Sequence, residues 1–158
     1  MSGVAHPAPA AIALTAARLA EIRLRLAGHV HRTPVVTSRL LSRLAGCELV
    51  LKGEHLQRGG AFKARGAFNF LLTLGEAERA AGVVTASSGN HGQAVALAAG
   101  ELGVAATVVV PEDIAEVKAA AIRDYGARIE VAGRSSAERI ARARAIAAAG
   151  PVNVPPYH

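Results

Sequence analysis

From Gly82 onward the sequence alternates between short apolar runs and longer alanine-rich runs, and this alternation constrains the fold more than any other feature. We expect strands at three of the short runs: GVVTAS, VAATVVVP and ARIEVAG. We expect helices at three of the longer runs: NHGQAVALAAGELG, AEVKAAAIRDYG and SAERIARARAIAAAG. Ser135 should cap the last helix, since Glu138 completes a capping box, and PVNV should begin another strand. Strands and helices joined by short connections predict an α/β fold with a mostly parallel, open sheet and flanking helices.

The chain before Gly82 has a less regular pattern, which predicts separate short elements. Thr15 is expected to cap a helix whose apolar stripe is Leu19, Ile22, Leu26 and Val30. Next along the chain, HRTPVV is expected to be extended and SRLLSRLAG to form a short helix. CELVLKGEHL is then expected to form a strand, and AFKARGAFNFLLTLG a helix. The start, MSGVAHPAPAAIALT, lacks the charged and apolar regions of a signal peptide. We therefore expect a disordered lead-in over residues 1–14.

Composition excludes several classes of function. The net charge of +6 comes mostly from arginines spread through the predicted helices, without the basic cluster or stacking aromatic residues that a nucleic-acid partner requires. The single Cys47 cannot form an intrachain disulfide, which suits a reducing compartment, and we expect it to pack in a strand as a small hydrophobic residue. No run reaches the length of a membrane span, so we expect no membrane partner and a cytoplasmic location.

Lys63, in the stretch GGAFKARGA, is one of only three lysines and lies just inside a predicted helix. An ordinary surface lysine is the alternative interpretation. Three features favour chemistry instead. Gly59, Gly60 and Gly66 allow another group to approach the backbone, and a helix N-terminus disfavours the positive charge. Partial burial beside the apolar Phe62 also favours the neutral amine. A neutral amine attacks aldehydes, which the guanidinium of arginine cannot do.

The stretch TASSGNHGQA joins a predicted strand to a predicted helix. Ser87, Ser88 and Asn90, with the backbone amides around Gly89, should face whatever lies at the helix N-terminus. Such a place binds anions, either carboxylate or phosphate. The alternative is a well-capped helix, with Asn90 as the N-cap and a glutamine three residues later. Two serines, a glycine, an asparagine and His91 exceed what capping requires, although a lone histidine is usually structural.

Four segments in this order resemble fold-type II pyridoxal-phosphate enzymes. LKGEHLQRGGAFKARGA resembles their lysine motif and SSGNHGQ their asparagine loop, while HRTPVV and VPEDIAEVKAAAIRDYGA resemble the segments before and after. Order and spacing are similar to those of the threonine dehydratase and serine racemase branch, from about Val30 to the last residue. The resemblance implies that residues 15–60 are the N-terminal part of a large domain and residues 61–150 a small α/β domain. Residues 151–158 would begin the return to the large domain, and the ending PPYH indicates truncation.

The resemblance also implies a role for each site residue. Lys63 would form a carbon–nitrogen double bond with the aldehyde of pyridoxal 5'-phosphate and then act as the base at the substrate's α-carbon. Phe62 would lie against the pyridine ring, and Asn90 would bind its phenolic oxygen. Four residues would hold the carboxylate of the amino acid: Ser87, Ser88, Gly89 and His91. Ser88 would also be a second acid or base on the face opposite Lys63.

The implied reaction is β-elimination of water from threonine or serine, which gives a 2-oxo acid and ammonia. Serine racemisation stays open, because Ser88 is compatible with both reactions. Two other hypotheses are a fragment that binds an anion or amino acid without catalysis, and an interaction fragment that needs a partner carrying the missing half. The full-length form is expected to be a homo-oligomer.

Two departures from the family's pattern limit these implications. First, Ala61 stands where many relatives have a serine. Second, the resemblance places three features of the family beyond His158: the phosphate cup, the group beside the pyridine nitrogen and the usual metal ligands. No metal site is therefore expected here. We expect structural roles for Lys52, Glu54 and Tyr125, and a solvated Lys118.

Overall fold

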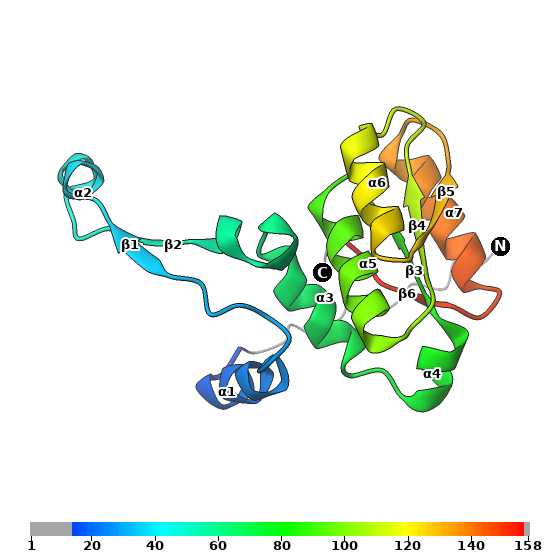
Figure 1. The fold of residues 1–158 in the computed structure, drawn as a ribbon, viewed down its shortest axis with the longest axis horizontal. Coiled ribbons are helices and arrows are strands. Elements are labelled where there is room, and N and C mark those ends of the chain that lie inside the picture. The colour runs from blue at the N-terminus through cyan, green and yellow to red at the C-terminus, as the bar shows by residue number, and fades with distance from the viewer. Residues whose placement is uncertain (1–13, 157–158) are drawn as a thin grey trace, which may run out of the picture.

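The computed structural model describes residues 14–156, and its main body is a parallel β-sheet with helices on both faces (Figure 1). The strands of this sheet, in the order β5-β4-β3-β6, are all parallel to their neighbours: β3 (Val83–Ala86), β4 (Ala106–Val110), β5 (Arg128–Val131) and β6 (Val152–Asn153). The helices of the body are α3 (Lys63–Leu71), α4 (Glu76–Ala81), α5 (Asn90–Leu102), α6 (Glu116–Asp124) and α7 (Ser136–Ala147). This arrangement confirms the predicted α/β fold.

The strands are apolar on both faces because helices cover both sides of the sheet. Val84 and Val109 are fully buried against α7. Val108 and Val110 point the other way, toward α5 and α6. Helix α3 packs on α5, with Phe68 fully buried between them. The sheet and α5 therefore form a rigid base for the loops at the carboxyl ends of the strands.

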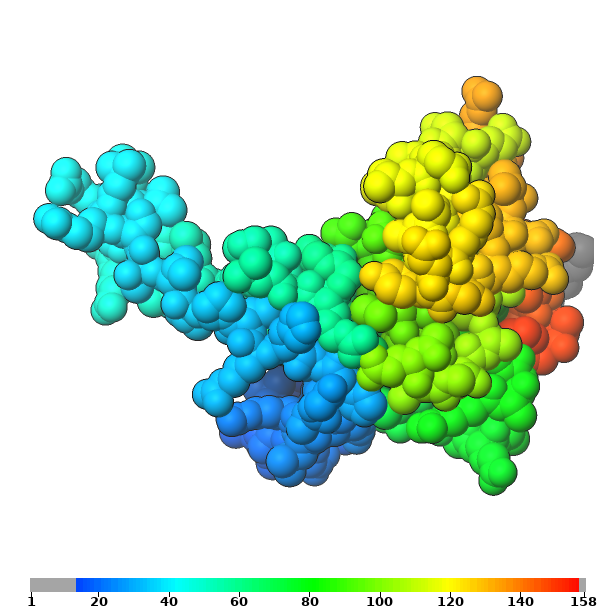
Figure 2. Space-filling view, in the orientation of Figure 1, coloured from blue at the N-terminus to red at the C-terminus, as the bar shows by residue number. Residues whose placement is uncertain are grey.

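The chain before Lys63 forms α1 (Ala16–Arg25), which Thr15 caps as predicted, and an arm that projects from the body (Figures 1 and 2). We define the arm as β1 (Val35–Thr37), α2 (Arg39–Ala45) and β2 (Val50–Lys52), in which β1 and β2 pair antiparallel. Two 3₁₀ turns, η1 (Glu54–Leu56) and η2 (Arg58–Gly60), lead from the arm to α3. No residue of the arm's three elements is buried. Seven of their large apolar side chains are exposed: Val35, Val36, Leu40, Leu41, Leu44, Val50 and Leu51.

Two expectations for this region need correction, and one short helix of the body was not predicted. The strand expected over CELVLKGEHL is limited to Val50–Lys52, because a strand extends only as far as its partner, and β1 has three residues. Cys47 does not pack in a strand; it is exposed in the bend after Gly46, which ends α2 in the left-handed conformation. Helix α4 was not expected. It begins after Gly75, whose amide donates to the carboxylate of Glu78 at 2.8 Å.

The lead-in predicted over residues 1–14 lies outside the described residues, apart from Leu14, and stays a prediction. The same holds for the last two residues of the return segment. Within residues 14–156, no helix is both long enough and apolar enough to cross a membrane.

Candidate active site

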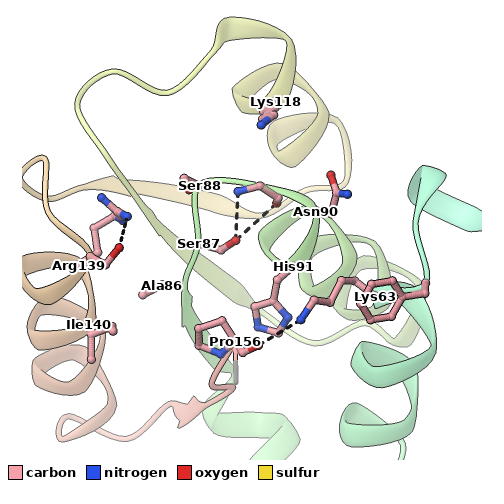
Figure 3. A pocket seen from close by; sticks show the side chains of 13 residues that line it. Lys63, Ala86, Ser87, Ser88, Asn90, His91, Lys118, Arg139, Ile140 and Pro156 are labelled. Carbon is pink, nitrogen blue, oxygen red and sulfur yellow. Dashed lines mark hydrogen bonds between the residues drawn. The ribbon is translucent and has the colours of Figure 1, made fainter. Parts of the chain in front are cut away.

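A cavity of about 400 Å³ opens at the carboxyl edge of the sheet, where β3 ends (Figure 3). The first residues of three helices line it: Lys63 of α3, Asn90 of α5 and Ser136 of α7. Parallel sheets place ligand sites at this edge, and helix N-termini favour anions there. All seven residues that the sequence predicted for the site line this one cavity: Phe62, Lys63, Ser87, Ser88, Gly89, Asn90 and His91.

The Lys63 side chain is half-buried and its amine reaches into the cavity (Figure 3). Its Nζ donates a hydrogen bond to the carbonyl oxygen of Pro156 at 3.1 Å. The same atom lies 5.4 Å from the centre of the Phe62 ring, close enough for a cation–π contact. Phe62 is 60% exposed, so its ring stands at the mouth of the cavity rather than in the core. An apolar ring and an amine therefore share one side of the site.

The loop between β3 and α5 forms another wall of the cavity. The hydroxyl of Ser87 accepts a hydrogen bond from the amide of Gly89 at 3.2 Å. The alternative interpretation, in which Asn90 caps α5, is wrong: Gly89 is the N-cap, and Asn90 is the first helical residue. No side chain caps this helix, so its first amides are available to an anion. The side chain of Asn90 does not cap the helix; the residue is exposed and lines the cavity.

Gly92 allows this loop to lie directly on the first turn of α5. A Cβ at this position would lie 2.8 Å from Cγ1 of Val108 and 3.2 Å from Cβ of Ser87. Both distances are shorter than an ordinary van der Waals contact between carbon atoms. The glycine is thus a packing requirement that keeps Ser87 against the helix.

The return segment after β6 closes another side of the cavity. The hydroxyl of Thr85, which is fully buried, donates to the carbonyl of Val154 at 2.6 Å, and Nε2 of His91 lies 3.3 Å from the same oxygen. Because that oxygen can only accept, Nε2 of His91 carries the proton of this contact. The two bonds fix the segment that brings the Pro156 carbonyl to Lys63.

Two basic residues of the cavity were not predicted as site residues. Arg139 of α7 is only 8% exposed, and its guanidinium donates to the carbonyl of Arg134 and to the hydroxyl of Ser136, both at 3.0 Å. Lys118, expected to be solvated, is half-buried on α6 and lines the cavity. Both residues lie near the N-terminus of a helix that follows a strand of the predicted sheet. That position was the signal in the sequence that could have identified them as cavity residues.

The cavity has a basic character. Lys63, Lys118 and Arg139 line it, whereas no aspartate or glutamate among residues 14–156 does. In the same part of the chain, no group of three histidine, cysteine, aspartate or glutamate residues could hold a metal ion. The site therefore suits a small molecule with at least one anionic group.

Comparisons with known proteins agree with this site. L-threo-3-hydroxyaspartate ammonia-lyase of Saccharomyces cerevisiae is 46% identical over 134 residues, which cover 84% of this chain and 41% of that protein. The catabolic L-threonine dehydratase TdcB of Escherichia coli is 40% identical over 138 residues, 87% of this chain and 42% of that one. The structure of maize serine racemase matches with a TM-score of 0.83 and 36% identity, over 89% of this chain and 43% of that one.

The chain thus spans about two fifths of the length of the relatives that it matches. A family model described as pyridoxal-phosphate dependent enzyme matches residues 26–158, which is most of the sequence. With this match and a fold shared with serine racemase, the chain belongs to the fold-type II family of pyridoxal-phosphate-dependent enzymes.

Proposed function

We propose that the protein is an ammonia-lyase that removes water from a hydroxy amino acid such as threonine or serine, giving a 2-oxo acid and ammonia. One observation carries the proposal: the Lys63 amine and the loop from Ser87 to His91 line the same cavity. A reactive amine and an anion site are the two features that an amino-acid substrate requires. The names of the relatives, which include a threonine dehydratase and a hydroxyaspartate ammonia-lyase, support this reaction class.

The residues of the cavity fit pyridoxal phosphate. When bound, the cofactor supplies an electron sink that stabilises negative charge at the α-carbon of the substrate. Lys63 would hold it covalently and later take the α-proton, with the Phe62 ring against the pyridine and the Asn90 amide on its phenolic oxygen. The carboxylate of the substrate would be held by the amide of Gly89 and by three side chains of the same loop: Ser87, Ser88 and His91.

Serine racemisation is a second candidate activity, favoured by the position of Ser88. Its side chain lines the same cavity as the amine of Lys63. A hydroxyl that returns the proton on the face opposite the lysine would invert the α-carbon instead of releasing water. The two activities differ in their products, since racemisation gives the D-amino acid and elimination gives a 2-oxo acid.

A 3-hydroxy dicarboxylic amino acid is a second candidate substrate, favoured by Arg139. Its nearly buried guanidinium lines the cavity together with Lys118, beyond the loop that would hold the first carboxylate. Guanidinium groups pair well with carboxylates. A substrate with a carboxylate on its side chain, as in the reaction named for the yeast relative, would place that group here.

The test is to incubate the purified protein with pyridoxal phosphate, reduce it with borohydride and map the adduct among Lys52, Lys63 and Lys118, the three lysines of the chain. We expect the adduct on Lys63, and none at that position in Lys63→Arg, which keeps the positive charge. Release of 2-oxo acid from threonine, serine and 3-hydroxyaspartate then ranks the substrates. Adducts scattered over all three lysines, with anion binding retained, would support the non-catalytic binding fragment instead.

A further inference from the structure

Four residues from three segments, none of which lines the cavity, form a polar cluster: Thr33, Lys52, Glu54 and Arg65. We call this cluster the Glu54 clamp. Arg65 of α3 donates to both carboxylate oxygens of Glu54, from Nε at 2.8 Å and from Nη2 at 2.6 Å. The hydroxyl of Thr33, 5% exposed, donates to the same carboxylate at 2.6 Å. The amine of Lys52 donates to the carbonyl of Thr33 at 2.5 Å.

The clamp is less exposed than the surface ion pairs of the body, and about as exposed as the pair Arg58–Glu101. The side chains of Arg65 and Glu54 are 33% and 20% exposed, whereas those of the pair Arg123–Glu116 on α6 are 55% and 79% exposed. A two-bond contact between a guanidinium and a carboxylate fixes orientation as well as distance. Hydrogen bonds from Arg65 and, more weakly, Thr33 hold the pKa of Glu54 at about 2, although burial raises it. The clamp therefore stays ionised at neutral pH.

Because Arg65 of the clamp lies on α3, the clamp can affect the position of Lys63 on the same helix. Ala64, Ala67 and Phe68 are buried, and packing against α5 fixes the body of the helix. The start of the first turn has no side-chain cap, because its N-cap residue, Phe62, makes no capping bond. Arg65 lies in this turn, two residues after Lys63. Its bonds to Glu54 tie the turn to the segment that leads from the arm.

Two glycines separate the anchored part of the connection before α3 from the helix. Gly59 and Gly60 have φ angles of 66° and 69°, in the left-handed region that glycine adopts without strain. Upstream of them, the side-chain amide of Gln57 is 3% exposed and bonds the backbone of His31 through both its oxygen and its nitrogen. The chain is thus held at Gln57, at Arg58, which pairs with Glu101 of α5 and lies over the Phe68 ring, and again from Ala64. Two glycines stand in the interval that leads to Lys63.

We propose that Glu54 and Arg65 are positioning residues for Lys63: they fix the first turn of α3 so that the lysine amine stays aimed into the cavity. The role of the lysine itself rests on the proposed function. The pair does not line the cavity, and it acts through the helix turn. Loss of the pair should leave the fold intact, because α3 remains packed on α5, but should let the amine leave its position.

The experiment compares Glu54→Gln, Arg65→Gln and the double variant with the wild-type chain. Each is treated with pyridoxal phosphate and borohydride, and in parallel with formaldehyde and cyanoborohydride, and the label on Lys63 is divided by that on Lys118. We expect each single variant to change both ratios by about fivefold, and the double variant by no more than the larger single change, since coupled residues are not additive. Arg142→Gln, which breaks the exposed pair with Glu130 on the other side of the sheet, is the matched control and should change neither ratio.

The outcomes separate the two proposals. A wild-type adduct that is absent from Lys63 overturns the proposed function, while the formaldehyde ratio still reports whether the pair positions the amine. Unchanged ratios in folded single variants overturn the positioning role. If Glu54→Gln does not fold, Glu54→Asp keeps the charge and shortens the reach, and it should give an intermediate change in both ratios; a wild-type ratio in that variant would equally contradict the proposal.

Discussion

Gly92 is a residue whose missing side chain shapes the site. A Cβ there would press on Val108 below and on Ser87 above, as the distances of 2.8 and 3.2 Å show. We expect Gly92→Ala to lower the free energy of unfolding by about 1–3 kcal/mol through overpacking, and to displace the Ser87 loop enough to weaken binding of small carboxylates. Urea unfolding and calorimetric titration with acetate measure the two effects. Gly66→Ala is the control, because a Cβ there has no neighbour within 4 Å, and acetate affinity in Gly92→Ala equal to that of this control would contradict the prediction.

Glu54 makes a pH-dependent contribution to stability, and its sign follows from its lowered pKa. The value in the folded chain is about 2, below the ordinary 4.5, so folding is favoured while the carboxylate is ionised. This contribution is complete above the ordinary value and is lost as the pH falls from 4.5 through about 2. After allowance for solvent screening, we expect about 1–2 kcal/mol. Unfolding curves of the wild type and Glu54→Gln should therefore differ near neutral pH and converge toward pH 2; a gap that is independent of pH would contradict this account.

At the residue scale, the sequence could identify side chains whose neighbours in the chain make them unusual. Lys63 beside glycines and Ser87 to His91 between a strand and a helix were such cases, and all of them line one cavity. Arg139 and Lys118 escaped prediction because an arginine or lysine in an alanine-rich helix looks the same whether it faces solvent or a cavity. Only the packing of α6 and α7 on the sheet distinguishes these two cases.

At the scale of the element, α7 depends on its predicted N-terminal cap. The amide of Glu138 donates to the hydroxyl of Ser135 at 3.2 Å, and the amide of Ser135 donates to the carboxylate of Glu138 at 2.9 Å. Ser135→Ala should lower the free energy of unfolding by about 1 kcal/mol. It should also loosen the turn that carries Ser136 and Arg139, and so weaken binding of a dicarboxylate such as succinate more than that of acetate.

The matched control for this prediction is Ser38→Ala, which removes the equivalent cap of α2 in the arm, far from the cavity. It should cost stability without changing the ratio of succinate to acetate affinity. Calorimetric titration of both variants measures that ratio. Equal ratios in the two variants would show that the cap of α7 does not affect the site.

Most elements of the body were predictable because each carries a local signal: the Ser135 cap of α7, the glycines that follow α5 and α6, or strands apolar enough for burial on both faces. The arm was less predictable because its elements depend on each other. The length of β2 is fixed by β1, with Val36 opposite Leu51, and nothing within CELVLKGEHL marks where that pairing ends. Helix α4 was missed because it has only six residues and buries none of them.

At the scale of the whole molecule, the body has a closed core and the arm has none. The arm's strands and helix expose seven large apolar side chains, although they pair with each other correctly. Isolated two-stranded hairpins are marginal in water unless another layer covers them, and exposed apolar patches of this kind mark association sites. An exposed arm is also what the interaction-fragment hypothesis expects, since the chain spans about two fifths of the length of its relatives.

We therefore expect the isolated chain to associate with itself through the arm, in a manner that depends on concentration. Leu40 and Leu44 lie one turn apart on α2 and are 63% and 75% exposed, so Leu40→Glu with Leu44→Glu should preserve the fold and shift the association midpoint to at least about tenfold higher concentration. Sedimentation velocity over a dilution series measures this shift. Leu24→Glu, at an equally exposed position on α1 outside the arm, is the control. If the control shifts association as much as the double variant does, the contact lies elsewhere; if only the arm variant does, self-association runs through the arm.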